Sequence, residues 1–462
     1  MHASTVRQIL ASFIITLSVL MSGTFFGWPS PVLHSGKVPA NMTSAQESWM
    51  VTCIEIGNLL LPLPAGYLMD VVGRRTCLAV SAPLALAGWA LIRLTSDVRC
   101  LYVARILHGC AMAVAYTVSP VYLGEIAGTD LRGSLSLFFQ GMNSSGILFV
   151  YIVGWMVTYN ALAVAMSAVP TSLIILLIFI PESPHYLSMK GDNDGALKSL
   201  SWLRSSDNAA ELEHEVRSMA TSSSGVGNAD SLLKTSGRAL AIVLVMGTCQ
   251  IFSGISALEA YASTAFKGDS KSGVGDSGDG MMTADACAVM LGLVALSSDL
   301  LSAVIIDRFG RRPLLLVSCI GCSISHAAAA YGLYRGRHEL LVLATLAGAM
   351  FFANTGIMPL VTTIVCEYFP TNKRAQANGI TQLVMTIASL VSLKIYQPIA
   401  DVYGVHMNFA LFAVVSVFSA AFVYRFIPET KGKTFKEIEM IFSEKKIAAD
   451  SDGGGGHVLC CC

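Results

Sequence analysis

The sequence has few charged residues for its length. Asp, Glu, Lys and Arg make up 13% of its 462 residues, whereas they make up about 25% of an ordinary soluble domain. Hydrophobic residues make up 54% of the chain. This balance excludes an ordinary soluble protein and predicts a chain that crosses a membrane several times.

The sequence also lacks the usual signs of an enzyme or a nucleic-acid binder. Its 30 basic and 30 acidic residues cancel, so no net positive field favours DNA or RNA. It has no P-loop signature and no nucleophile–base pairing. The 12 cysteines are mostly scattered through apolar runs, where a thiol behaves as a small hydrophobe. We therefore expect no enzyme, no metal site, no cofactor and no disulfide framework.

Long apolar runs dominate what is present. About 20 apolar residues span a bilayer, and the sequence contains twelve runs of that kind. The first follows a basic residue but is long enough to span, so we interpret it as an uncleaved helix and not as a signal peptide. The expected spans are 8–28, 48–69, 76–94, 100–124, 134–158, 161–180, 238–265, 283–306, 313–334, 340–366, 375–399 and 406–427.

Short polar motifs repeat in the two halves of the chain. An acid, a glycine turn and a basic pair occur at 70–75 and again at 307–312, each time between two apolar runs. An acid followed seven positions later by Arg also occurs twice, and so does a Pro-Glu-Ser/Thr tripeptide. The members are Glu125 with Arg132, Glu367 with Arg374, Glu182 and Glu429. Because the three motifs recur in one order at nearly one offset, the chain reads as two homologous halves.

This pattern predicts an all-α membrane protein of twelve transmembrane helices in two pseudo-symmetric six-helix bundles. The expected parts are the first bundle (1–180), a cytosolic linker with short helices (181–237), the second bundle (238–430) and a cytosolic tail (431–462). Lys and Arg collect in the short loops of one face, which predicts that this face and both termini are cytosolic.

Two modification sites remain open from the sequence. Asn41 begins a glycosylation sequon in a loop on the opposite face, so we expect it to be glycosylated. The chain ends in Cys460, Cys461 and Cys462, which offer thiols for acylation or prenylation but fit the prenylation pattern poorly.

Taken together, these motifs resemble the sugar-porter branch of the major facilitator superfamily, over almost the whole chain. Residues 28–33 and 47–49 are most similar to the insect facilitated trehalose transporters. The resemblance implies two bundles that rock about a central site by alternating access. The matching motifs are the two Asp-x-x-Gly-Arg-Arg turns, Ala104-Arg105, 120–125, 131–133, 181–187, Gln250 with Ser253-Gly254, and 428–434.

A neutral polyol that crosses a bilayer exchanges water for amides and hydroxyls on inward helix faces. Such groups form one stripe on the fifth span and another on the seventh, and the resemblance implies that Gln140 and Gln250 contact sugar. Gln382 follows from the repeat, because it lies fifteen beyond Glu367 as Gln140 lies fifteen beyond Glu125. The expected site residues are Gln140, Asn143, Gln250, Ser253, Ser256, Tyr261, Thr362 and Gln382.

Several positions depart from the family's pattern. They are Ile251, Ser256, Ala295, Thr362 and Met385. Each lost amide partner leaves a ligand hydroxyl unpaired at a cost of roughly 1–3 kcal/mol. The sequence therefore leaves the identity of the transported solute open. We expect a facilitative carrier of a hexose, disaccharide or polyol. The alternatives are a same-fold carrier of an organic cation or a proton-coupled substrate, and a sugar sensor that does not transport, which the short tail disfavours.

The charged loops predict an inner gate. Exposed ion pairs contribute about 0–1 kcal/mol each, but a network formed in one conformation biases an equilibrium. The expected gate residues are Asp70, Gly73, Arg74, Arg75, Arg105, Glu125, Arg132, Glu182, Asp307, Gly310, Arg311, Arg312, Glu367, Arg374 and Glu429.

Acids inside the spans raise the question of coupling. Proton-coupled members of the resembled family carry an Asp in the first helix, and residues 9–31 contain no acid, which favours passive transport. Glu55, Glu259 and Asp299 nevertheless lie within later spans, where acids are costly. A wet vestibule and a cation-coupling role both remain open. We expect a monomer in the plasma membrane.

Overall fold

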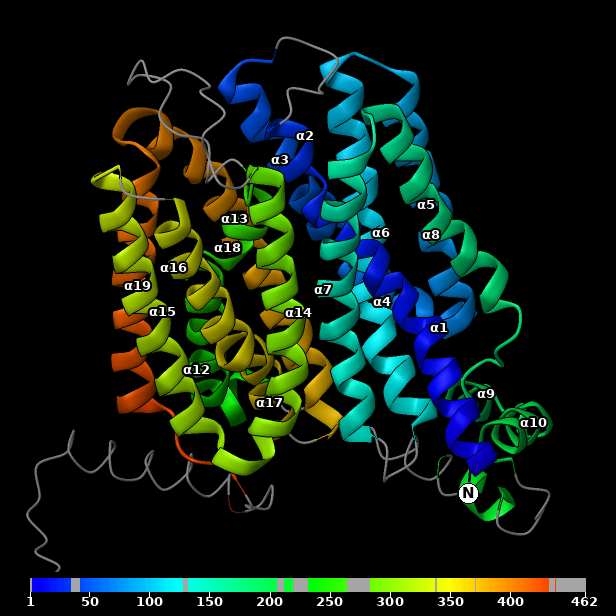
Figure 1. Ribbon diagram of the computed structural model, residues 1–462. Coiled ribbons are helices and arrows are strands. Elements are labelled where there is room, and N and C mark those ends of the chain that lie inside the picture. The colour runs from blue at the N-terminus through cyan, green and yellow to red at the C-terminus, as the bar shows by residue number, and fades with distance from the viewer. Residues whose placement is uncertain are drawn as a thin grey trace, which may run out of the picture.

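The computed structural model describes residues 2–34, 42–127, 132–205, 212–217, 219, 232–263, 283–336, 339–369, 371–431 and 437. All regular structure in these ranges is helical, and most helices run side by side (Figure 1). The expected all-α architecture is confirmed.

The first half begins with a long helix, α1, which is separated from the short helix α2 by the single turn residue Trp28. The next span is bent by 45° where α3 passes into α4. Pro62 begins α4, and a proline is tolerated at a first helical position but not within a helix. The elements are α1 (His2–Gly27), α2 (Pro29–His34), α3 (Ser44–Leu60), α4 (Pro62–Val72), α5 (Arg74–Leu94), α6 (Val98–Ile126), α7 (Arg132–Met156) and α8 (Tyr159–Leu177).

Two spans of the second half are interrupted. Gly254, with φ of +90°, separates α12 from α13; a Cβ there would lie 2.2 Å from the ring of Phe412, so only glycine fits. A π-helix, η2 (Ala353–Ile357), separates α16 from α17. The elements are α12 (Leu232–Phe252), α13 (Ile255–Ala260), α14 (Ala284–Phe309), α15 (Arg311–Tyr334), α16 (Glu339–Phe352), α17 (Met358–Tyr368), α18 (Thr371–Tyr403) and α19 (Val405–Phe426).

The spans lie where hydropathy predicts them. Ten helices in the described ranges are long and apolar enough to cross a membrane, and the bent pair α3–α4 makes an eleventh. The remaining expected span, 134–158, corresponds to the 25-residue helix α7. The chain is therefore a multi-pass membrane protein.

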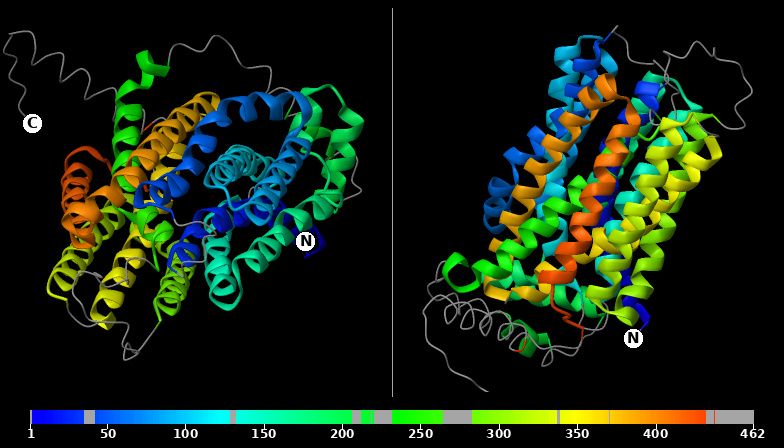
Figure 2. Two further views of the ribbon diagram at one scale, coloured as in Figure 1. Left: turned by 90° about the horizontal axis from the view of Figure 1, so that it is seen from above. Right: turned by 90° about the vertical axis from the view of Figure 1, so that its left-hand side faces the viewer.

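The two halves lie side by side. Helices α1–α8 (blue to blue-green) occupy one side of Figure 1 and α12–α19 (green to orange) the other, and Figure 2 shows the same division from above. They meet where α7 packs on α14 and α3 packs on α18. We call the end that carries Gly73 and Gly310 the basic end, and the opposite end the far end. The N-terminus and the end of α19 both lie at the basic end (Figure 1).

The segment between the halves is anchored to the first half. It contains α9 (Pro184–Met189), α10 (Asn193–Arg204) and a helical stretch at 212–217. In α10, Ser199 donates a 2.6 Å hydrogen bond to the carbonyl of Glu182. The carbonyl of Trp202 accepts one of 3.0 Å from Arg7 of α1. The exact boundaries of the predicted parts, at 180, 237 and 430, stay predictions.

Candidate functional site

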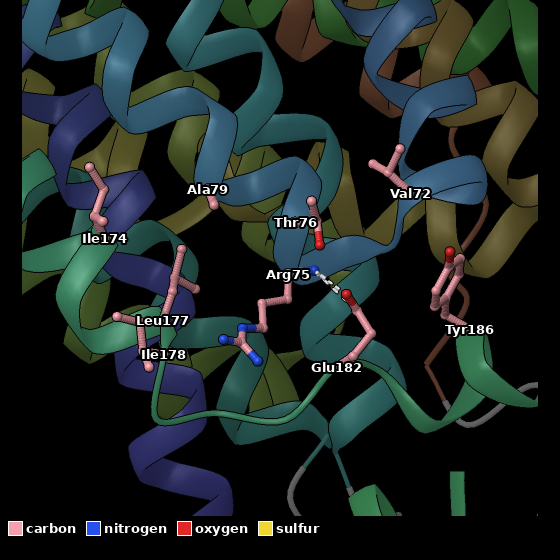
Figure 3. A pocket seen from close by; sticks show the side chains of 9 residues that line it. All are labelled: Val72, Arg75, Thr76, Ala79, Ile174, Leu177, Ile178, Glu182 and Tyr186. Carbon is pink, nitrogen blue, oxygen red and sulfur yellow. Dashed lines mark hydrogen bonds between the residues drawn. The ribbon is translucent and has the colours of Figure 1, made fainter. Parts of the chain in front are cut away.

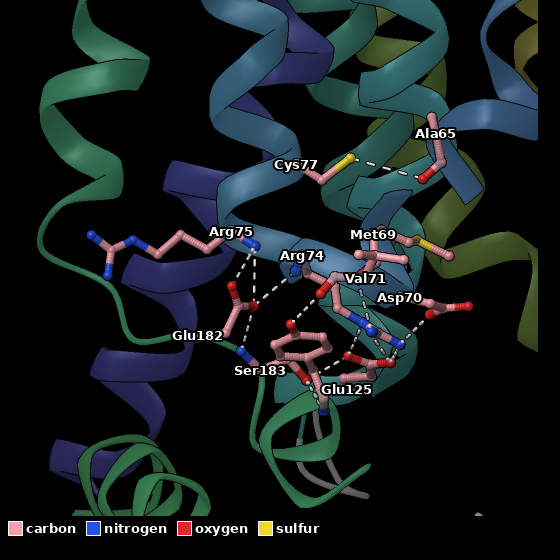
Figure 4. Close-up of polar contacts among 11 residues, drawn as sticks. Ala65, Met69, Asp70, Val71, Arg74, Arg75, Cys77, Glu125, Glu182 and Ser183 are labelled. Carbon is pink, nitrogen blue, oxygen red and sulfur yellow. Dashed lines mark hydrogen bonds and ion pairs between the residues drawn. The ribbon is translucent and has the colours of Figure 1, made fainter. Parts of the chain in front are cut away.

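Arg74 is the centre of a buried polar cluster at the basic end of the first half. Its side chain is 4% exposed, and its guanidinium donates to both carboxyl oxygens of Glu125, with Nε 3.0 Å from Oε2 and Nη2 3.0 Å from Oε1. Nη2 also lies 3.1 Å from Oδ1 of Asp70, and Nη1 donates to the carbonyl of Met69. Figure 4 shows these contacts converging between α4, α5 and α6. Such a bidentate geometry fixes the Arg and the carboxylate together.

Glu182 binds the start of α5. Its Oε1 accepts from the backbone amides of Arg74, Arg75 and Ser183 at 2.9 to 3.0 Å. These are amides that a helix start leaves unpaired, and the helix dipole favours an anion there. Gly73 has φ of +100°, and a Cβ on it would lie 2.4 Å from Oε2 of Glu182. The positive φ therefore requires the glycine, and a Cβ there would also displace the Glu182 carboxylate from the helix start.

The second half repeats this bonding. Nε of Arg311 lies 2.9 Å from Oε1 of Glu367, and Nη1 donates to a carbonyl one turn before the glycine. Glu429 accepts from the amides of Arg311 and Arg312 at 3.0 and 3.1 Å. The hydroxyl after that Glu, on Thr430, donates to Glu367 as Ser183 donates to Glu125.

The backbone amides around Glu429 also shift its titration. Burial raises the pKa of Glu429, but hydrogen bonds from four backbone amides outweigh it, so its pKa lies below the ordinary value of 4.5. The carboxylate is therefore charged at neutral pH and satisfied by the helix start.

The expected gate set is only partly assembled. Arg105 was expected among the basic-end charges, and that pairing is wrong. Because α6 runs from the far end to the basic end, Arg105 lies two turns from the far end. There its guanidinium donates to the carbonyls of Phe25 at 2.6 Å and Met50 at 3.2 Å. Arg75 contributes only its backbone amide to the cluster. The side chains of Arg132, Asp307 and Arg374 lie outside the described part.

Hydrogen bonds between the halves occur at the far end and at mid-depth. Ser30 and Ser263 bond through their hydroxyls at 2.9 Å, and Lys394 of α18 donates to Ser48 of α3 at 3.3 Å. Ser44 also donates to a carboxyl of α18. The described bonds of the two basic-end clusters, by contrast, stay within their own halves. The structure therefore shows a conformation that is joined at the far end.

Two of the expected sugar-contact residues have amide atoms without partners. The Nε2 of Gln140, on α7, and the Oε1 of Gln250, on α12, are buried and have no hydrogen-bond partner in the described part of the chain. Gln250 is 4% exposed, and its Nε2 contacts the sulfur of Met358 at 3.1 Å. Buried polar atoms are nearly always paired, so these two indicate a place where a ligand or water bonds.

The other expected site residues are bonded within the protein or only partly described. Asn143 accepts from Tyr116 at 2.9 Å, and Ser253 donates to a backbone carbonyl. Tyr261 stacks on Tyr396 with ring centroids 4.6 Å apart. Ser256 is buried in α13 and Gln382 is half-buried in α18, while Thr362 has no described side chain and Asn41 lies outside the described residues.

The three intramembrane acids are buried, which argues against a wet vestibule around them in this conformation. Glu55 accepts from Ser389 at 2.8 Å and from Asn58 at 3.1 Å. Asp299 accepts from Ser144 of the other half. Glu259 and Asp299 each have one buried carboxyl oxygen with no partner in the described part. Their cost in a membrane makes them candidates for a role.

Sequence reasoning missed Asn354. It lies in the π-helix, is fully buried, and neither atom of its amide has a partner in the described ranges. π-Helices occur frequently at functional sites. An amide within an apolar run, two residues before Gly356, was a signal that could have been used.

Comparison with known proteins decides the family. A family model described as "Sugar (and other) transporter" matches residues 8–442. The chain belongs to this transporter family. Among curated members, it is 26% identical over 447 residues to the facilitated trehalose transporter Tret1 of Bombyx mori, covering 94% of this chain and 86% of that one. It is 30% identical over 457 residues to Tret1 of Apis mellifera ligustica, covering 94% and 88%.

Solved structures of transporters share the fold. The inward-open conformation of the xylose transporter XylE from E. coli aligns with a TM-score of 0.79 at 20% identity, covering 94% of this chain and 99% of that one. XylE bound to 6-bromo-6-deoxy-D-glucose aligns with a TM-score of 0.71 at 22% identity, covering 93% and 98%. The predicted fold, two six-helix bundles of the major facilitator type, is confirmed, and so is the expectation that the protein is a transporter and not an enzyme.

Proposed function

We propose that this chain is a facilitative carrier that moves a sugar or polyol across a membrane by alternating access. The observation that carries the proposal is a pair of buried amide atoms, on Gln140 and Gln250, that have no partner among the residues the structure describes. One is a donor and the other an acceptor, they come from opposite halves, and a sugar hydroxyl both donates and accepts. The named trehalose and xylose transporters among its relatives support a sugar as the substrate class.

Purified protein in proteoliposomes tests this directly. We expect uptake of at least one member of a panel of hexoses, trehalose and polyols, with no dependence on a pH gradient. Gln140→Ala and Gln250→Ala should each lower uptake at subsaturating substrate by about tenfold, because each removes a hydrogen bond to the ligand worth roughly 1–3 kcal/mol. Gln376→Ala is the control, since Gln376 is an exposed amide on α18. Absence of any sugar flux, or unchanged uptake in both glutamine variants, would contradict the proposal.

The two basic-end clusters are proposed as the gate on that side. In the far-joined conformation each cluster bonds within its own half. We infer that when the far end opens, the basic ends approach and the clusters contact each other across the boundary. Such a network favours one conformation over the other. The proposed gate residues are Asp70, Arg74, Glu125, Glu182, Arg311, Glu367 and Glu429.

A carrier coupled to protons, or one for an organic cation, is the second candidate. It is favoured by Glu259 and Asp299, which lie within two of the spans and each have one carboxyl oxygen with no partner in the described ranges. The same liposomes distinguish it, because an imposed pH gradient would then drive accumulation, or an organic cation would be carried in place of a sugar.

We propose further that the basic end faces the cytosol, in the plasma membrane, and that the protein acts as a monomer. The Arg pairs of the short turns support this orientation through the positive-inside rule. Protease protection of tags at the two ends tests it: both tags should be cleaved only from the cytosolic side.

A further inference from the structure

We propose that a groove between α5 and α8, at the basic end, binds the phosphate of an anionic phospholipid through the guanidinium of Arg75. The groove is a cavity of about 560 Å³. Figure 3 shows its two sides, with Arg75 and Ala79 on α5 and Ile174 and Leu177 on α8. The ligand class follows from the position, the charge and the walls of this groove.

The position of the groove is at the limit of the membrane layer. The span of α5 begins at Arg74 and the span of α8 ends at Leu177, so the groove lies where acyl chains give way to headgroups. Its walls are mainly apolar, and Ile178 at its edge is 65% exposed. A small soluble anion gains nothing from contact with apolar walls, whereas the acyl chain of a lipid packs against them.

Arg75 is the residue of the groove whose charged side chain is available to bind a ligand. Its guanidinium makes no hydrogen bond or ion pair with any residue that the structure describes. The neighbouring carboxylate, Glu182, is already bonded by the backbone amides of α5. In Figure 3 the Arg75 side chain extends away from that carboxylate and towards Ile178. An arginine in this state binds phosphate oxygens in a forked geometry, and basic pockets between membrane helices bind lipid headgroups.

The second half supplies an internal comparison. Arg312 is the counterpart of Arg75, and its Nη2 donates a 2.6 Å hydrogen bond to the carbonyl of Tyr424. Its guanidinium also lies 5.5 Å from the ring of Tyr424. Tyr424 precedes Pro428 by four residues, as Leu177 precedes Pro181. Arg312 therefore has a backbone acceptor and an aromatic ring, although its buried Nε has no partner in the described part of the chain. Leu177 offers Arg75 no ring, and no described carbonyl accepts from its guanidinium, so Arg75 is left to an external anion.

Native mass spectrometry of the purified full chain, with lipid added back in equal amounts, tests the proposal. We expect phosphatidylserine or phosphatidylglycerol to be retained on the wild type at least tenfold better than phosphatidylcholine. Arg75→Ala should lower that retention about tenfold, as loss of a charge-assisted hydrogen bond does. Arg312→Ala is the matched control and should leave it unchanged.

A second variant guards against a general loss of structure. Leu177→Tyr keeps Arg75 but supplies the aromatic partner found in the other half, so it should also lower retention of the anionic lipid. Equal retention by wild type and Arg75→Ala, or equal binding of phosphatidylcholine, would overturn the proposal. Displacement of the lipid by millimolar inorganic phosphate would overturn it too, because it would identify a soluble anion as the ligand.

Discussion

Ser389 of α18 donates a 2.8 Å hydrogen bond to Oε1 of Glu55 in α3, and so joins the two halves inside the membrane layer. Asn58, one turn from Glu55, adds a 3.2 Å bond to Thr386, one turn from Ser389. These bonds join faces that must separate if the far end is to open, so they stabilise the far-joined conformation against the other.

Replacing Ser389 with Ala should therefore populate the far-open conformation. Loss of one hydrogen bond of about 1 kcal/mol changes the equilibrium roughly fivefold. Cys53, which is 4% exposed in α3, reports the opening through its rate of alkylation by a water-soluble maleimide, read by mass spectrometry. Ser392→Ala is the control, because Ser392 is also buried in α18 but makes no described hydrogen bond to α3. Equal alkylation rates in the wild type and Ser389→Ala would show that this bond does not hold the far end closed.

The two basic-end clusters should act alike, because each pairs an Arg at a helix start with a Glu near the end of the next span of the same half. Glu125→Gln and Glu367→Gln each leave an Arg short of a charged partner. Each should slow transport severalfold, with surface expression, measured by antibody binding to a tag, near that of the wild type. Uptake in vesicles measures the rate. Normal rates in both variants would remove the gate proposal without touching the proposed sugar site.

Glu429 should stabilise the protein at neutral pH and not in acid. Its pKa in the folded protein is below 4.5, since four backbone amides favour the charged form more than burial disfavours it. A carboxylate with a lowered pKa contributes stability above its unfolded pKa, and this is lost as pH falls through the folded value. Glu429→Gln should therefore lower Tm at pH 7, and the difference from the wild type should shrink below pH 4.5.

The matched control is Glu213→Gln, because Glu213 is 53% exposed and its ion-pair partner Arg217 is 84% exposed. Exposed pairs contribute little, so its Tm should follow the wild type at every pH. A Tm difference for Glu429→Gln that persists unchanged in acid would rule out the charged cap as its cause.

Asp299→Asn separates passive from coupled transport. Asn keeps an oxygen that accepts from Ser144, as Asp299 now does, but it cannot exchange a proton. If the carrier is passive, as we propose, the variant should retain most of its sugar uptake, and uptake should not respond to a pH gradient in either protein. Loss of pH-driven accumulation specifically in Asp299→Asn would instead identify this carboxyl as the coupling group.

Hydropathy and repeats were enough to predict the fold. Each span carries a run of apolar residues long enough for the bilayer, and the repeated glycine turns identified the two halves. The partners within each basic-end cluster also followed from the repeat. The repeat could not predict which way each side chain points. Arg74 and Arg75 are neighbours in one motif, but successive residues lie about 100° apart around a helix. One is buried among carboxylates, and the other faces the groove beside α8.

The bonds between the halves had no sequence signal. Ser389 and Thr386 are ordinary polar residues in an apolar helix, and which residues face α3 depends on how two helices from distant parts of the chain pack. The π-helix around Asn354 was also not predicted: Pro359, two residues past its end, indicates a disturbed helix but not a turn with an added residue. Arg105 was misplaced for a simpler reason. Its helix runs from the far end to the basic end, so a residue near the start of that helix cannot reach the basic end.

The anchoring of α10 has a consequence for how motion is observed. Ser4 and Arg7 of α1 donate to the carbonyls of Leu203 and Trp202, so this short helix travels with the first half as one body. A fluorophore on the exposed face of α10 would thus act as a fixed landmark. The distance between this fluorophore and a second dye on α19 would change each time the protein opens or closes, and could be followed in real time.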